Sequence, residues 1–450
     1  MAEDSRRLIT PSRGDGVTKV ATEVLGGPVG RFARVDGHSW LYVGAVLSAM
    51  ASMVLALGVL QKNHCERVGW GAPGAFWRAC YSDLPVGVGG QVGSTPWTTG
   101  GSGQTQPVLT AILTWGLQNL VPGGGSTLHK QQIFYAICAV VITVLVAGAT
   151  IATASMLRGS PWQAAHVALS PVLITASLLS LDVLGVALAT IGMALWVRRM
   201  PVAAGVLLAG AVMARTYPLI IIAAIVLLAI RERRGPEVVR MLASVLVISV
   251  VCVFAAVAVG GDPFAPYRVW AGAAASYGSP WLVASIVGLT IAPTALTVIS
   301  VLGWVVALLA GMLRVSLPGP VRLGPLTLMM LVIVLVTGRS FPLQACLWVL
   351  PLIAISAIRW REHLLWAAVE IVYFLTVWMY AGFASNPAKA LAPAGYAVFC
   401  VIRLVAYGGI ALASWESAED LNDRMRPRGR PAVSSQTDRT ADFRGDAAPA

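Results

Sequence analysis

Long apolar segments alternate with short polar turns along most of this chain. Runs of about 15 to 25 apolar residues recur from Leu41 to Ala413, and a helix needs about 20 such residues to cross a hydrocarbon layer roughly 30 Å thick. The expected segments are 41–61, 131–157, 162–180, 182–197, 202–214, 216–230, 238–260, 292–313, 323–338, 342–357, 363–383 and 394–414. The pattern therefore predicts an all-α, polytopic transmembrane protein of about 10 to 12 membrane segments.

The composition agrees with this class. Hydrophobic residues make up 57% of the chain and charged residues 12%, with a mean hydropathy of +0.75. An average soluble chain has roughly 25% charged residues, so a soluble enzyme or a secreted domain is excluded. Residues 1–39 and 415–450 are polar, and we expect them to be disordered cytoplasmic tails on either side of a membrane catalytic domain over 40–414.

The net charge of +12 does not indicate a nucleic-acid partner, because the basic residues stand in short clusters between apolar runs. Such clusters indicate which loops lie on the cytoplasmic side of the membrane. Basic loops face the cytoplasm. If the N-terminal tail is cytoplasmic, threading the segments makes 62–130 a long external loop and about 260–281 a second one. Within the first loop, the apolar stretch 106–121 is too short to span and predicts a helix lying on the outer surface.

Four charged residues fall on the same external side in this threading. Asp83 lies in the first loop, Asp182 and Arg339 lie at turns, and Arg215 lies between two segments of about 13 to 15 residues that resemble a short hairpin. An ionisable residue held within the membrane usually faces a cavity or a charged partner. These residues are therefore candidates for a functional site.

Two arginines and two carboxylates suit transfer of a sugar from a lipid phosphate. Arginine binds phosphate oxygens through its planar fork of donors, and a carboxylate can accept the proton of an attacking hydroxyl. Structural roles compete with this interpretation. Asp83 can be a solvated loop residue, Asp182 can cap the helix that follows it, and the arginines can pair with acids or reach the interface.

The cysteines and histidines bear on two further kinds of chemistry, disulfide formation and metal binding. Cys65 and Cys80 share the predicted external loop, where they can form a disulfide closing a loop of about 15 residues or remain free thiols. The histidines have no metal-ligand spacing to one another or to cysteine, and no resident cofactor is expected.

Several short motifs, in their order along the chain, carry a resemblance to a known family. They are Cys80-Tyr81-Ser82-Asp83-Leu84-Pro85, Pro107-Val108-Leu109-Thr110, Ala168-Leu169-Ser170-Pro171 with Asp182, Ala204-Gly205, Arg215-Thr216-Tyr217-Pro218, Tyr277-Gly278-Ser279, Arg339, Gln344 with 347–352, and Trp366 with Glu370 and Tyr373. In this arrangement, over about residues 40 to 415, the chain resembles the family 87 glycosyltransferases, which are actinobacterial mannosyltransferase-like membrane proteins of the C superfamily. Arg215 and Arg339 stand where lysine is expected in that family, and the segment after Phe341 departs from its pattern.

The resemblance implies an inverting transfer of a hexose, typically mannose, on the outer face of the plasma membrane. The donor would be a polyprenyl-phosphate sugar, and the acceptor a glycolipid, a lipoglycan or another cell-envelope glycan. Asp83 occupies the position of the essential loop aspartate and would be the general base. Asp182, Arg215, Tyr217, Arg339 and Gln344 would bind the substrates.

Two alternatives stay open. A transporter or a lipid-linked-sugar flippase also places charges inside the membrane, although such proteins often contain inverted repeats and no convincing repeat is found here. An inactive relative of the transferases is the other alternative, because of the departures near Pro342.

Overall fold

The structure is a computed structural model that describes residues 39–88, 93–98, 101–157 and 159–425, and every regular element in these ranges is helical. Six helices are long and apolar enough to cross a membrane. They are α2 (Trp40–Val68), α6 (Thr127–Met156), α12 (Gly235–Ala258), α15 (Pro293–Ser316), α18 (Trp360–Ala381) and α19 (Pro393–Met425). The chain is therefore an all-α, multi-pass membrane protein, as its apolar pattern predicts.

Other predicted segments form helices that are too short to span. These are α9 (Asp182–Val197), α10 (Pro201–Ala214), α11 (Pro218–Arg231), α16 (Leu323–Thr337) and α17 (Ala345–Ile355). The longest of them, α9, has 16 residues and is therefore only about 24 Å long at 1.5 Å per residue. Of the 10 to 12 expected membrane segments, six are therefore helices long enough to cross a membrane and most of the others are shorter apolar helices, among them the short hairpin predicted around Arg215, which is α10 and α11.

The expected segment 162–180 is not a continuous helix. It consists of η3 (Pro161–Ala164), α7 (Ala165–Ala168) and α8 (Val172–Ala176). The break falls at Pro171, whose ring disfavours helical backbone at the preceding residue and which lacks an N–H. This interrupted segment brings the carbonyls of residues 178 and 179 to the loop that carries Asp83.

The basic turns between helices lie together at one end of the bundle. The Arg198 guanidinium packs over the Trp40 ring at 4.7 Å, where α2 begins. Arg231 donates to the Val315 carbonyl at 2.9 Å, where α15 ends. Arg314, in the last turn of α15, packs over the Trp415 ring of α19. These contacts collect the positively charged turns at the end where α2 begins and α19 finishes.

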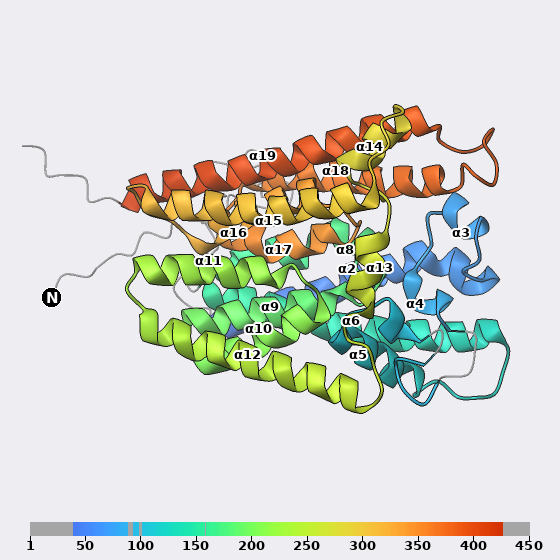
Figure 1. The fold of residues 1–450 in the computed structure, drawn as a ribbon, viewed down its shortest axis with the longest axis horizontal. Coiled ribbons are helices and arrows are strands. Elements are labelled where there is room, and N and C mark those ends of the chain that lie inside the picture. Colours follow the sequence, from blue (N-terminus) through green and yellow to red (C-terminus); the bar gives the residue numbers. More distant parts are fainter. Residues whose placement is uncertain (1–38, 89–92, 99–100, 158, 426–450) are drawn as a thin grey trace, which may run out of the picture.

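The long loops gather at the opposite end of the bundle, on the right in Figure 1. Between α2 and α6 they contain α3 (Gly74–Trp77), α4 (Asp83–Val86), η2 (Ser102–Gln104) and α5 (Val108–Gln118). Between α12 and α15 they contain α13 (Ala265–Gly272) and α14 (Pro280–Ile286). The helix expected within 106–121 is therefore present as α5, and it begins directly after Pro107.

Both ends of the membrane domain can be compared with their predicted boundaries. Ser39 accepts a hydrogen bond from the Tyr42 N–H and caps α2, close to the expected start at residue 40. At the other end α19 continues to Met425, so residues 415–425 do not belong to a disordered tail. The sequence has no Pro or Gly from Ser414 until Pro427, and nothing stops the helix earlier. The remaining tail predictions, over 1–38 and 426–450, lie outside the described residues.

Candidate active site

The centre of the site is an ion pair between Asp182 and Arg215. Asp182 is the first residue of α9, and Arg215 is the residue at which α10 ends. The Arg215 Nε donates to Asp182 Oδ1 at 2.8 Å, and Nη2 donates to the same oxygen. The Asp182 residue is 3% exposed, so its side chain serves this ion pair and does not cap α9.

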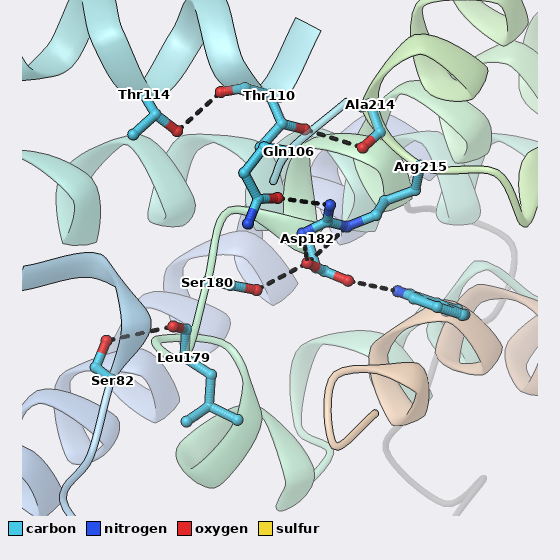
Figure 2. A network of polar contacts seen from close by, with 10 residues as sticks. Ser82, Gln106, Thr110, Thr114, Leu179, Ser180, Asp182, Ala214 and Arg215 are labelled. Atoms are coloured by element: carbon cyan, nitrogen blue, oxygen red, sulfur yellow. Dashed lines mark hydrogen bonds and ion pairs between the residues drawn. The ribbon is translucent and has the colours of Figure 1, made fainter. Parts of the chain in front are cut away.

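Further hydrogen bonds fix both charged groups (Figure 2). Ser180 Oγ donates to Asp182 Oδ1 at 2.8 Å, and Trp348 Nε1 of α17 donates to Asp182 Oδ2 at 3.1 Å. The Arg215 Nη1 donates to Gln106 Oε1 at 2.8 Å. The network therefore joins the loop before α5, the start of α9, the end of α10 and helix α17.

Tyr217 packs against Trp348 of this network and is not among the residues that line the cavity beside Asp83. Its ring stacks on the Trp348 ring at a centroid distance of 4.7 Å and an interplanar angle of 6°. Tyr217 is 3% exposed. Tyr217 is therefore buried against Trp348 and fixes the orientation of that ring, while its contact with substrate stays a prediction.

The loop segment that ends in Asp83 is anchored at every residue from 79 to 83. The anchors are the Gln61 side chain on the Ala79 carbonyl (2.6 Å), the Cys65–Cys80 disulfide, the Lys62 ammonium on the Tyr81 carbonyl (3.0 Å), the Ser82 hydroxyl on the Leu178 carbonyl (2.7 Å) and the Asp83 N–H on the Leu179 carbonyl (2.9 Å). Three of them come from the end of α2 and two from the segment after α8. Asp83 is thus held rigidly although it lies in a loop.

Cys65 and Cys80 form a disulfide, which is one of the two alternatives that their positions in the sequence left open. Cys65 and Cys80 are bonded, with a Cα–Cα distance of 5.8 Å, and both are buried. Cys65 lies in α2 itself, because the helix continues to Val68, past the expected end at residue 61. The bridge therefore fastens the Asp83 loop to a membrane helix rather than to another loop.

Asp83 opens into a cavity of about 960 Å³. Its side chain is exposed, and it is the one charged residue among those lining this cavity in the described part of the chain. Most other lining side chains carry hydroxyl or amide groups: Ser94, Thr95, Thr98, Ser102, Gln104, Thr105, Gln106, Thr110, Thr114, Gln118 and Ser180. Trp115 and Phe134 add aromatic rings. Through Gln106 and Ser180, the cavity wall touches both sides of the Asp182–Arg215 pair.

The electrostatic environment of Asp83 is unusual for a loop carboxylate. Protein atoms around the recess desolvate the side chain, which raises its pKa above the ordinary value, and the nearby Asp182 carboxylate adds to this effect. A hydrogen bond from the Tyr81 side chain and the charges of Arg215 and Lys62 act in the opposite direction. Asp83 therefore has a higher proton affinity than a freely solvated aspartate, as a general base requires.

Arg339 does not join this site. Its guanidinium donates to the Ala271 carbonyl at 3.0 Å, to the Pro293 carbonyl at 3.3 Å and to Thr297 Oγ1, and it packs over the Trp270 ring at 4.3 Å. The residue is 1% exposed. It holds the end of α13 against the start of α15, which is a structural role in place of the expected contact with phosphate.

Gln344 also lies outside the lining of the cavity. It is the N-cap residue of α17 and is half-buried, four positions before Trp348 and therefore one helical turn away. The expected site residues thus divide into two sets. Asp83, Asp182 and Arg215 come together, whereas Tyr217 and Gln344 support or flank Trp348 and Arg339 fixes a different loop.

Sequence reasoning missed several residues that build the site. Gln106, Ser180 and Trp348 hydrogen-bond to the central pair, and Lys62 anchors the loop. Lys62 gave one usable signal, a basic residue directly after an apolar run. Gln106 and Trp348 were not singled out as site residues, although Trp348 lies in the 347–352 motif, because a single amide or indole in an apolar segment is common in membrane proteins.

Metal chemistry has no evident ligand set here. Among the described residues, no group of three or more His, Cys, Asp or Glu side chains is placed to hold a metal ion. The groups that the site offers are carboxylate, guanidinium, hydroxyl and amide groups. In comparisons with known proteins, no family model matches this chain and no curated protein is significantly similar to it.

Proposed function

We propose that this protein is a membrane glycosyltransferase that moves a hexose, with mannose as the expected sugar, from a polyprenyl phosphate to a lipid-linked or cell-envelope glycan. One observation carries the proposal above all others. Asp83 is rigidly anchored at the wall of a hydroxyl- and amide-rich cavity, beside the Asp182–Arg215 pair. The motif order that resembles the family 87 glycosyltransferases points to the same activity.

The reaction follows from these groups. Asp83 accepts the proton of an acceptor hydroxyl while the oxygen attacks the anomeric carbon of the donor sugar. A new glycosidic C–O bond forms, the bond from the anomeric carbon to the phosphate oxygen breaks, and the polyprenyl phosphate leaves with the electron pair. Because attack and departure occur on opposite faces of the sugar, the anomeric configuration inverts.

The cavity suits a carbohydrate better than an ion. Its lining offers many neutral donors and acceptors and a single charge, and sugar hydroxyls need paired donors and acceptors of this kind. Trp115 and Phe134 offer flat apolar surfaces of the kind that cover the C–H face of a sugar ring.

Arg215 is the cation that this proposal assigns to the departing phosphate. Its hydrogen bonds to Asp182 and Gln106 use three of the five N–H donors of a guanidinium, and its side chain keeps 18% of its surface exposed. Asp182 orients the guanidinium and balances its charge in the absence of substrate. No phosphate contact is assigned to Arg339, because backbone carbonyls and Thr297 accept hydrogen bonds from both terminal nitrogens of its guanidinium.

The proposed location is the plasma membrane, with the site on the outer face. The basic turns gather at the end of the bundle opposite the Asp83 loop, and basic turns favour the cytoplasmic side. A donor with a long polyprenyl chain would reach the site from the lipid phase, with its phosphate at the membrane surface.

The test is a transfer assay on purified protein in detergent, with radiolabelled polyprenyl-phosphate mannose and a membrane lipid extract. Wild type should label the acceptor fraction, and Asp83→Asn should fold normally yet transfer no label. Asp262→Asn is the matched control, because Asp262 is an exposed loop carboxylate paired with Arg268 and should leave transfer intact.

Two results would contradict the proposal. Turnover retained by Asp83→Asn would remove its role as the base. No transfer by wild type, with labelled donor crossing vesicle membranes instead, would favour a flippase.

A further inference from the structure

Lys62 is a fully buried lysine close to the proposed base. Its residue is 0% exposed, its ammonium group donates to the Tyr81 carbonyl at 3.0 Å, and it lies 5.4 Å from the centroid of the Phe374 ring. Lysine is almost never fully buried unless it is paired. A carbonyl and a ring only partly compensate an ammonium ion, so the nearby negative charge of Asp83 matters for this residue.

A neutral donor could provide the mechanical part of this arrangement. Gln61, the preceding residue of α2, shows this directly, because its amide holds the Ala79 carbonyl at 2.6 Å in the same loop segment. What Lys62 adds to such an anchor is a positive charge, and that charge acts on the Asp83 carboxylate. Gln61 therefore anchors the loop without a charge, whereas Lys62 anchors the loop and can also carry a charge.

The charged and titratable groups around Asp83 come from each neighbouring element. Lys62 is on α2, Tyr81 precedes Asp83 in the loop, Asp182 begins α9 and Arg215 ends α10. Helix α6 presents Phe134 to the cavity, and the hydroxyl of its Tyr135 is buried without a hydrogen-bond partner among the described residues. Arg215 is already balanced by direct contact with Asp182, whereas no carboxylate of the described residues forms an ion pair with Lys62.

We propose that Lys62 is a positioning residue for Asp83: its buried amino group fixes the loop through the Tyr81 carbonyl, two residues before Asp83, and in its ammonium form it favours the charged Asp83 carboxylate. This inference rests on the proposed transferase for its meaning in catalysis. The electrostatic effect itself can be measured without any turnover.

The experiment uses the full-length protein in detergent and measures carbodiimide modification of Asp83 by peptide mass spectrometry as a function of pH. Carbodiimides react with the protonated carboxyl, so the midpoint reports the ionisation of Asp83. Lys62→Gln and Lys62→Met should move the midpoint upward by about half a pH unit or more, roughly a threefold change in the ionisation constant. Lys62→Arg should retain the wild-type midpoint.

Gln61→Leu is the matched control, since it removes a neutral anchor from the same loop and should leave the midpoint in place. The acid limb of kcat/KM should follow the same order among these variants. A wild-type midpoint in both Lys62→Gln and Lys62→Met, or an equal shift in Gln61→Leu, would overturn the proposal. If no variant or wild type transfers sugar, the labelling result still decides the role of Lys62, and only the proposed function fails.

Discussion

Ser82 donates its hydroxyl hydrogen to the Leu178 carbonyl at 2.7 Å, and this contact joins the two carboxylate-bearing segments of the site. Ser82 precedes Asp83, and Leu178 lies four residues before Asp182. The neighbouring bond from the Asp83 N–H to the Leu179 carbonyl doubles the connection. Asp83 and Asp182, about 100 residues apart in sequence, therefore occupy fixed positions relative to one another.

The buried ion pair gives the first prediction. Arg215→Met should lower the free energy of unfolding by about 3 to 5 kcal/mol, because it leaves the Asp182 carboxylate buried without its charge partner. Thermal unfolding in detergent measures the loss. Arg268→Met removes an exposed ion pair with Asp262 and should cost less than about 1 kcal/mol. Equal losses in the two variants would show that burial does not determine the cost.

Part of this site could be predicted from the sequence. Asp83, Asp182 and Arg215 were expected to share one side because alternating segments place every second turn at the same end, and membrane-embedded charges seek partners. That rule predicts on which side of the membrane a turn lies, but it does not predict which turns on that side are in contact. Arg339 satisfies the same rule, yet its donors are taken by carbonyls at the ends of α13 and α15.

The partners of Arg215 were less accessible than the lengths of the helices around it. The segments on either side of Arg215 were expected to have about 13 to 15 residues, and α10 and α11 have 14 each. Their shortness is what places Arg215 within the bundle, where Asp182 and Gln106 can reach it. Such contacts join segments 33 and 109 residues apart, and no local pattern in the sequence reports them.

The disulfide gives the second prediction. Cys65→Ser should destabilise the protein by about 3 kcal/mol, the value that the chain-entropy model gives for a closed loop of 15 residues. It should also reduce transfer, because the bridge is one of the anchors of the Asp83 loop. Cys252→Ser changes a free cysteine in α12 and serves as the control for melting temperature and activity. Full transfer by Cys65→Ser would mean that the remaining anchors suffice.

The raised pKa of Asp83 predicts that low pH reduces transfer but favours the contribution of this residue to stability. Transfer should fall as the pH drops through a pKa that lies above the ordinary aspartate value of about 3.9. Since this carboxyl binds its proton more tightly in the folded state, its contribution to stability is present at low pH and is lost as the pH rises through the folded-state pKa. Asp83→Asn, which is inactive, should therefore be at least as stable as wild type at neutral pH. Melting temperatures measured against pH test this, and a destabilised Asp83→Asn would contradict it.

The hydrogen bond from Trp348 to Asp182 gives the last prediction. Trp348→Phe removes the donor to Asp182 Oδ2 and retains a ring that can stack on Tyr217. A hydrogen bond to a charged group contributes about 1.5 to 3 kcal/mol, so stability should fall by that amount. Because α17 then loses its direct contact with the central pair, kcat should decrease while the acid limb set by Asp83 stays in place. Trp366→Phe is the matched control: its buried indole nitrogen has no hydrogen-bond partner among the described residues, so only packing is lost. A shifted acid limb in Trp348→Phe would instead mean that Asp182 regulates the ionisation of Asp83 through its own hydrogen bonds.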